Sequence, residues 1–160
     1  MGATFFQGLK HKNMKFEFSA GGIVVKKSII NNQKSEILVL VCQHSQHHGW
    51  VFPKGLIGDH IKDEAKEETA IREVEEETGA KGKIIQPLTP VEYEYLFENE
   101  QIHKTVYYFL MEFIGGDITK HDMEMENVEW LSINEVALRL TYDSDKKVWN
   151  QAEKLLISNF

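Results

Sequence analysis

Residues 58–80 read "GDHIKDEAKEETAIREVEEETGA" and place four glutamates within five positions. At about 100° per residue, Glu73, Glu76 and Glu77 fall within an arc of roughly 100° on one helix face, whereas Glu75 points away. Each like-charged pair at these spacings costs about a few tenths of a kcal/mol on an exposed helix. A helix tolerates such a face if solvent screens it, or if it binds a hard cation such as Mg²⁺, which prefers oxygen ligands.

The pattern around this stretch predicts an α/β fold of the mixed-sheet (α+β) type. Asp63 is the expected N-cap of a helix that runs to about Thr78, and Gly79 is expected to end that helix in a left-handed conformation. Two further helices are predicted near residues 133–140 and 145–156, and residues 28–34 as a hairpin loop. Strands are predicted over residues 16–27, 35–43, 49–55, 80–88, 91–97, 103–115 and 127–132. Strands that flank a few helices in this way favour one mixed sheet with helices on its faces.

Length and composition limit the number of domains and the classes of function that the chain can have. A chain of 160 residues with 42% hydrophobic content predicts a single domain over residues 15–160. Residues 1–14 are expected to be either a flexible leader or residues added to the natural chain. No apolar run approaches the roughly 20 residues that cross a bilayer, so we expect a cytoplasmic protein without membrane contact. The net charge of -7 argues against general binding to nucleic-acid backbones, and an anionic substrate would need a local counter-charge such as a divalent metal.

A longer pattern contains the glutamates. It is G-x5-E-x7-R-E-U-x-E-E-x-G-U, where U is apolar, and its fixed positions are Gly58, Glu64, Arg72, Glu73, Glu76, Glu77 and Gly79. The last U is Ala80, which is smaller than the usual Ile, Leu or Val. This pattern resembles the signature of the Nudix hydrolases. The resemblance implies an α/β/α sandwich with a catalytic loop-helix-loop, and hydrolysis of a nucleoside diphosphate linked to another group, with Mg²⁺ or Mn²⁺ as cofactor.

The resemblance also implies roles for the residues of the pattern. Glu76 and Glu77 correspond to the principal metal ligands, together with the main-chain carbonyl of Gly58. Glu73 corresponds to a further ligand or to the general base, and Arg72 to the residue that orients it through a charge-assisted pair. Such a reaction needs charge neutralisation and an aligned water more than a covalent nucleophile.

Two more acidic residues are catalytic candidates. On an unbroken helix Glu64 would lie about 180° from Glu73, so we expect Glu64 to act from the loop or the first turn. The segment "HDMEMENVEWL" offers Glu124, Glu126 and Glu129, and we favour Glu124. It stands six positions before a tryptophan, as an extra glutamate does in related dinucleoside-polyphosphate hydrolases; a solvated loop acid is the alternative.

The segment "GWVFPKG" at residues 49–55 resembles a stretch of the diadenosine polyphosphate hydrolases. Its Lys54 is a candidate for binding phosphate, which a negatively charged protein needs near its site. Further candidates for substrate binding are His103 and Lys104 for the phosphates and Tyr93, Tyr95 and Tyr107 for stacking on adenine. The alternatives are a polar hairpin tip for the first two and strand packing for the tyrosines. For "HSQHHG" at residues 44–49 we favour a mobile polar loop over a transition-metal site.

The leading hypothesis is therefore an asymmetric hydrolase that cleaves diadenosine tetraphosphate to ATP and AMP. Enzyme alternatives are a nucleoside-triphosphate pyrophosphatase, an RNA 5'-end pyrophosphohydrolase and a diphosphoinositol-polyphosphate hydrolase, the last of which calls for a denser basic patch. The alternative of another class is a nucleotide-binding sensor without turnover. The expected partner is a small nucleotide, with nucleic acid only as an RNA 5' end, and the expected assembly is a monomer or a homodimer.

Overall fold

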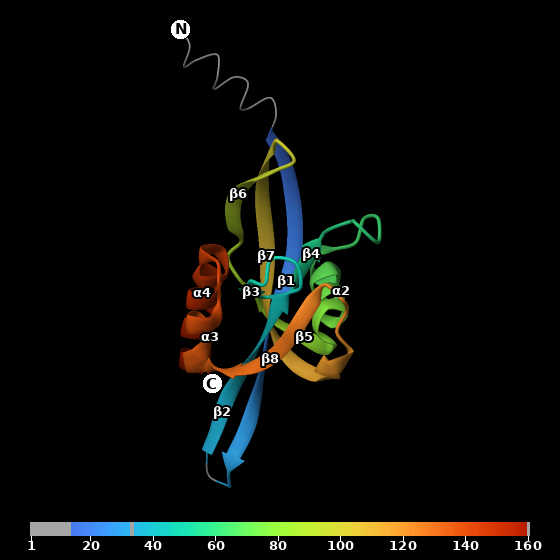
Figure 1. The fold of residues 1–160 in the computed structure, drawn as a ribbon. Coiled ribbons are helices and arrows are strands. Elements are labelled where there is room, and N and C mark those ends of the chain that lie inside the picture. Colours follow the sequence, from blue (N-terminus) through green and yellow to red (C-terminus); the bar gives the residue numbers. More distant parts are fainter. Residues whose placement is uncertain (1–13, 33, 160) are drawn as a thin grey trace.

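The computed structural model describes residues 14–32 and 34–159 (Figure 1). The stretch expected as a leader, residues 1–14, lies outside the described residues except for Met14, which begins the first strand. No helix in the described ranges is long and apolar enough to span a membrane.

One mixed sheet forms the centre of the fold. Its strands are β1 (Met14–Asn31), β2 (Lys34–His44), β3 (Trp50–Val51), β4 (Lys54–Leu56), β5 (Ala80–Pro87), β6 (Val91–Phe97), β7 (Glu100–Gly116) and β8 (Met125–Ser132). β1 pairs with β7 in parallel, and the other pairings are antiparallel. The predicted hairpin loop at residues 28–34 is wrong for most of its length. Its first residues continue β1 and pair with β2 as far as Asn31, opposite Lys34.

Helices cover both faces of the sheet, with α2 (Lys66–Thr78) on one side and α3 (Ile133–Arg139) and α4 (Asp143–Asn159) on the other (Figure 1). Ala70 and Val74 of α2 pack into one buried apolar cluster, and Val148 and Trp149 of α4 pack into another. Burial of such side chains is the main stabilising contribution, at about 25 cal/mol per Å² of apolar surface. These layers confirm the predicted α/β/α sandwich.

The two ends of α2 differ in how well the sequence predicted them. Gly79 ends the helix in a left-handed conformation, as predicted, and its N–H donates to the carbonyl of Glu75 at 2.8 Å. The predicted N-cap, Asp63, is wrong: the helix begins two residues later than expected, with Ala65 as its N-cap. Asp63 itself adopts a φ of 61°. The chain turns there because the next residue, Glu64, is held by side chains of α2.

We predict that Gly79→Ala destabilises the fold much more than Gly58→Ala does. Both glycines have φ near 78°, so each alanine pays about 1 to 2 kcal/mol for the left-handed conformation. At Gly79 the new Cβ would also lie 2.0 Å from the carbonyl oxygen of Asp117, whereas at Gly58 it meets nothing within 4 Å. Crowding should add about 1 to 3 kcal/mol at Gly79. Urea unfolding measures both changes; equal losses would contradict the proposed crowding.

Candidate active site

The acidic side of α2 faces a cleft of about 670 Å³. Glu73, Glu76 and Glu77 line this cleft, and Glu73 and Glu77 are buried. Glu75 is exposed outside the cleft lining, where its carboxylate lies 3.9 Å from the ammonium of Lys81. The helix therefore separates the four glutamates as their spacing predicted.

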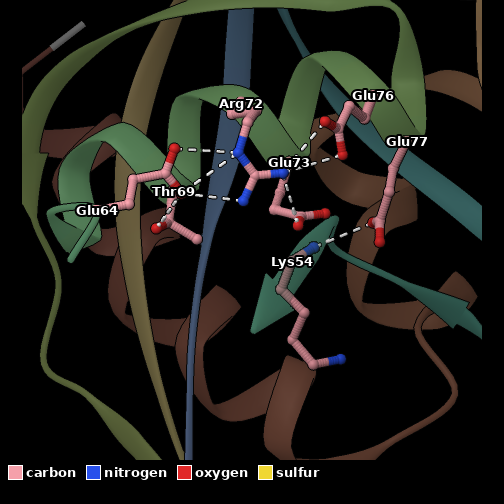
Figure 2. Close-up of polar contacts among 7 residues, drawn as sticks. All are labelled: Lys54, Glu64, Thr69, Arg72, Glu73, Glu76 and Glu77. Carbon is pink, nitrogen blue, oxygen red and sulfur yellow. Dashed lines mark hydrogen bonds and ion pairs between the residues drawn. The ribbon is translucent and has the colours of Figure 1, made fainter. Parts of the chain in front are cut away.

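Arg72 lies between three carboxylates (Figure 2). Its Nε donates to both oxygens of Glu64 at 3.2 and 3.0 Å, and its Nη2 donates to Glu64 at 2.9 Å. Its Nη1 donates to Glu73 and to both oxygens of Glu76, each at 3.1 Å. Thr69 Oγ1 adds a donor to Glu64 at 2.7 Å. Because hydrogen bonds to a carboxylate favour its charged form, the Arg72 guanidinium and then Thr69 hold the pKa of Glu64 below its ordinary value, despite burial.

The segment from β3 to β4 borders the same cleft. The N–H of Lys54 donates to Glu77 Oε2 at 3.1 Å, and the N–H of Phe52 donates to Asp145 Oδ1 at 3.1 Å. The Lys54 side chain extends away from Glu77 (Figure 2) and lines the cleft. Burial lowers the pKa of the Lys54 ammonium, but Tyr93, Asp145 and Glu77 together raise it by more, so Lys54 keeps its charge at neutral pH.

Gly55, rather than Gly58, lies against the carboxylates. A Cβ at Gly55 would lie 2.1 Å from Cδ of Glu73, so any other residue there would displace this carboxylate. Gly58 is exposed and is not among the residues that line the cleft. In the sequence pattern, the first fixed glycine is Gly58, six positions before Glu64, and it was therefore the candidate for the carbonyl ligand. The signal for Gly55 was its place directly after Pro53 and Lys54, where the chain enters the site.

Acids from the connection between β7 and β8 complete the cleft. Asp122 and Glu124 line it, and the N–H of Asp122 donates to the carbonyl of Glu76 at 3.0 Å. Glu124 was a sequence candidate, whereas Asp122 was not. The other two glutamates considered in this segment have partners outside the cleft lining. Glu126 shares a hydrogen bond with Nδ1 of His48 at 2.6 Å, and Glu129 forms an ion pair with Arg139.

The charge in the cleft is suited to a bound cation. Burial raises the pKa of Glu77 well above its ordinary value, and the nearby charges of Glu73 and Glu124 add to this, although Lys54 opposes it. Burial likewise raises the pKa of Glu73, with Arg72 opposing it. A divalent cation would relieve this cost, and carboxylate oxygens are the ligands that Mg²⁺ and Mn²⁺ prefer. The donor set therefore fits the metal that the family resemblance implies.

Histidines that the sequence did not assign to the site also line the cleft. One ring nitrogen of His60 and one oxygen each of Glu73 and Glu76 lie within 4.8 Å of one another. His60 comes from the loop between β4 and α2, which has no periodicity to mark it. His44 and His47 come from the loop expected to be polar and mobile, yet their rings stack at 4.2 Å and backbone hydrogen bonds close the loop.

A second pocket, of about 480 Å³, adjoins the cleft. Tyr93, Tyr95 and Tyr142 line it, and it shares His47, Val51 and Lys54 with the cleft. The hydroxyl oxygen of Tyr142 and Nδ1 of His47 lie 2.9 Å apart. The two spaces therefore meet at a cationic side chain and an imidazole.

The remaining candidates for substrate binding divide between the two faces of the sheet. Lys104 lines the cleft, and its ammonium lies 3.7 Å from Glu17. Tyr107 and His103 line neither space. The ammonium of Lys66 in α2 lies 4.7 Å from the Tyr107 ring centroid, and His103 lies 3.5 Å from two glutamates of β6. Side chains alternate along a strand, so residues 103 and 107 point to the face opposite residue 104.

The fold and the cleft define a mixed-sheet α/β/α domain whose candidate site is an acidic helix face. The model of the NUDIX domain family matches residues 27–152. The chain therefore belongs to the NUDIX domain family, as its sequence pattern predicted.

Two named proteins are similar to this chain in sequence. The chain is 34% identical over 143 residues to the proposed mutator protein MutT4 of Mycobacterium tuberculosis (strain CDC 1551 / Oshkosh), covering 88% of this chain and 56% of that protein. It thus spans little more than half the length of that relative. It is 27% identical over 144 residues to the asymmetrical bis(5'-nucleosyl)-tetraphosphatase of Rattus norvegicus, covering 88% of this chain and 95% of that protein.

Solved structures share the fold. A binary complex of the Ap4A hydrolase of C. elegans has a TM-score of 0.65 and 19% identity, covering 89% of this chain and 98% of that one. The NUDIX domain of Shewanella oneidensis NrtR, complexed with ADP ribose, has a TM-score of 0.65 and 22% identity, covering 98% and 99%. At these identities the likeness establishes the fold.

We predict that Glu77→Gln stabilises the metal-free protein at neutral and higher pH. The folded-state pKa of Glu77 is raised above the ordinary value of 4.5, so its charged form disfavours the folded state above that raised pKa. As pH falls through it, the folded chain takes up a proton and regains stability. Glutamine keeps the acceptor for the Lys54 N–H without the charge. In EDTA, the Tm difference between variant and wild type should therefore be largest at about pH 8 and shrink towards about pH 5.

The control for this measurement is Glu75→Gln, on the exposed side of the same helix. It should leave Tm nearly unchanged at every pH, because a surface charge contributes little. If the Tm difference between Glu77→Gln and wild type did not vary with pH, the environment of the Glu77 carboxylate would not disfavour its charged form.

Proposed function

We propose that the protein is a divalent-metal-dependent pyrophosphohydrolase that cleaves dinucleoside polyphosphates, such as diadenosine tetraphosphate, into a nucleoside triphosphate and a monophosphate. The observation that carries this proposal is the junction of the acidic cleft with the tyrosine-lined pocket at Lys54 and His47. Cleavage of the phosphate chain requires the acidic cleft. A substrate that joins a flat nucleobase to that chain requires the tyrosine-lined pocket as well.

The acidic helix supplies the metal site in this proposal. Glu73, Glu76 and Glu77 would hold Mg²⁺ or Mn²⁺, with the carbonyl of Gly55 as the backbone candidate in place of Gly58. When bound, the cation supplies neutralisation of phosphate oxygens and activation of the attacking water. The carboxylates converge from one helix face, so the metal position is fixed by the helix rather than by a loop.

Glu73 is the proposed general base, with Glu124 as a further acid in the cleft. A base works best when its pKa lies near the working pH, and burial raises the pKa of Glu73 in that direction. Arg72 Nη1 donates to Glu73 at 3.1 Å and keeps the carboxylate oriented. Glu64 is a positioning residue, because its three contacts with Arg72 fix the guanidinium.

In the reaction, a water oxygen attacks one phosphorus of the chain and the bridging P–O bond on that phosphorus breaks. One proton of the water passes to Glu73, and the other stays with the oxygen that is now bound to phosphorus. The oxygen of the broken bond leaves with the second nucleotide, so the products are a nucleoside triphosphate and a nucleoside monophosphate. Lys54 and Lys104, both in the cleft lining, compensate the charge of phosphates beyond the bond that breaks. Tyr93 and Tyr95 stack on a base in the adjoining pocket.

Two named relatives support this substrate class. The rat relative, matched over nearly its whole length, is named as an asymmetrical bis(5'-nucleosyl)-tetraphosphatase, and a C. elegans Ap4A hydrolase has the same fold. The acidic cleft alone would serve a nucleoside triphosphate or an RNA 5' end equally well. The tyrosine-lined pocket favours a substrate with a base beyond the cleaved phosphates.

Product analysis tests the proposal. The wild-type protein is incubated with Mg²⁺ or Mn²⁺ and, separately, diadenosine tetraphosphate, ATP or a 5'-triphosphorylated RNA. We expect ATP and AMP from the dinucleotide at a higher kcat/KM than the other two substrates give. Glu77→Gln should lower kcat by about two orders of magnitude or more, whereas Glu75→Gln should not. Faster cleavage of ATP or RNA would refute the substrate class, and binding without turnover would favour the sensor.

We predict that Tyr93→Leu raises KM for diadenosine tetraphosphate far more than Tyr107→Leu does. Loss of one base–aromatic contact costs about 1 to 3 kcal/mol, or roughly 5- to 150-fold in affinity. Tyr93 lines the pocket, whereas Tyr107 lies over α2, so the pair compares the same substitution on opposite faces of the sheet. Steady-state kinetics at saturating metal measures both. A larger effect at Tyr107 would place the base elsewhere.

A further inference from the structure

The loop between β4 and α2 brings one imidazole to the acidic cleft. His60 is exposed and lines the cleft together with Glu73 and Glu76. Its ring nitrogen and one oxygen from each glutamate all lie within 4.8 Å of one another.

His60 differs from the other histidines of the described ranges in having no competing partner. His44, His47, His48, His103 and His121 each have a ring nitrogen in a hydrogen bond or an ion pair. The ring of His60 takes part in neither within the described part of the chain, and the residue is exposed. Its side chain can therefore turn towards the carboxylates without giving up another contact.

We propose that His60 is a nitrogen ligand of the ion held by Glu73 and Glu76, and that it biases the site towards first-row transition-metal ions over Mg²⁺. Two ligands at about 2.1 Å from one ion lie at most about 4.2 Å apart, so a group within 4.8 Å needs only small side-chain movements. This inference rests on the proposed function, because it concerns the same metal site.

The chemistry of the donor atoms sets the direction of this bias. Mg²⁺ binds oxygen ligands and keeps several waters, so it gains little from an imidazole. For a site that contains nitrogen, affinity rises in the order Mn²⁺, Fe²⁺, Co²⁺. A helix face with glutamates alone would discriminate less among these ions. The nitrogen of His60 therefore makes the relative affinity for Co²⁺, Mn²⁺ and Mg²⁺ a direct measure of its role.

The test measures metal binding without substrate. Metal-free wild type, His60→Ala, Glu77→Gln and the control His48→Ala are titrated with Mg²⁺, Mn²⁺ and Co²⁺ by calorimetry, and Co²⁺ binding is also followed by visible absorption. We expect His60→Ala to raise Kd about 10-fold or more for Co²⁺, less for Mn²⁺, and within about twofold for Mg²⁺. The Co²⁺ absorption bands should shift in this variant. His48→Ala should match wild type, because His48 pairs with Glu126 outside the cleft lining.

The outcomes separate this inference from the proposed function. If Glu77→Gln weakens binding of all three ions but His60→Ala leaves the three Kd values and the Co²⁺ bands unchanged, His60 is not a ligand and the proposed metal site stands. An equal loss for all three ions in His60→Ala would also overturn the nitrogen-ligand assignment. If wild type binds none of the ions, or Glu77→Gln binds them as wild type does, the metal site of the proposed function itself fails.

Discussion

The ion-pair network around Arg72 is the interaction on which the site depends. The Arg72 side chain is 18% exposed, and its guanidinium holds Glu64, Glu73 and Glu76 at once, so one cation offsets repulsion that would otherwise oppose the helix. Only arginine has donors in a fixed fork that can reach three carboxylates from one position. Removing one partner of a largely buried pair typically costs about 3 to 5 kcal/mol, because the remaining charge is left without a partner. The same contacts that make the acidic helix stable also fix where its carboxylates point.

A second constraint joins the helix layers through one short segment. Where β3 leads into β4, the N–H of Phe52 donates to Asp145 of α4, and the N–H of Lys54, the first residue of β4, donates to Glu77 of α2. Helices on opposite faces of the sheet thus hold consecutive parts of one strand-to-strand connection. The charge of Lys54 is consequently placed where the cleft and the tyrosine-lined pocket meet. Gly55, next in the chain, allows Glu73 to approach the backbone at a distance that a side chain would prevent.

The sequence predicted the sheet, the helix layers and the glutamate face because each follows from a periodicity or a spacing of the chain itself. Gly79 was predictable for the same reason: a helix end needs a left-handed residue, and glycine adopts that conformation without strain. The loop before α2 was not predictable in this way. Asp63 is not the N-cap: its backbone is left-handed, and the side chain of its neighbour, Glu64, pairs with Thr69 and Arg72 of the helix that follows. His60 had no pattern to mark it, since its position depends on how the loop folds over the helix.

The division between the helix and the second pocket explains why a sequence pattern predicts chemistry more readily than substrate. The carboxylates that would act on a phosphoanhydride come from one continuous stretch, so their spacing alone predicts their arrangement. The pocket is lined by Tyr93 and Tyr95 of β6, by Tyr142, which directly precedes α4, and by His47 from the loop after β2. Their meeting depends on sheet pairing and helix packing rather than on spacing. Under the proposed function, discrimination among phosphorylated compounds would therefore depend on contacts between distant segments. Tyr93 and Tyr95 lie on one strand face at the pocket, whereas Tyr107, on the other face of the sheet, does not line it.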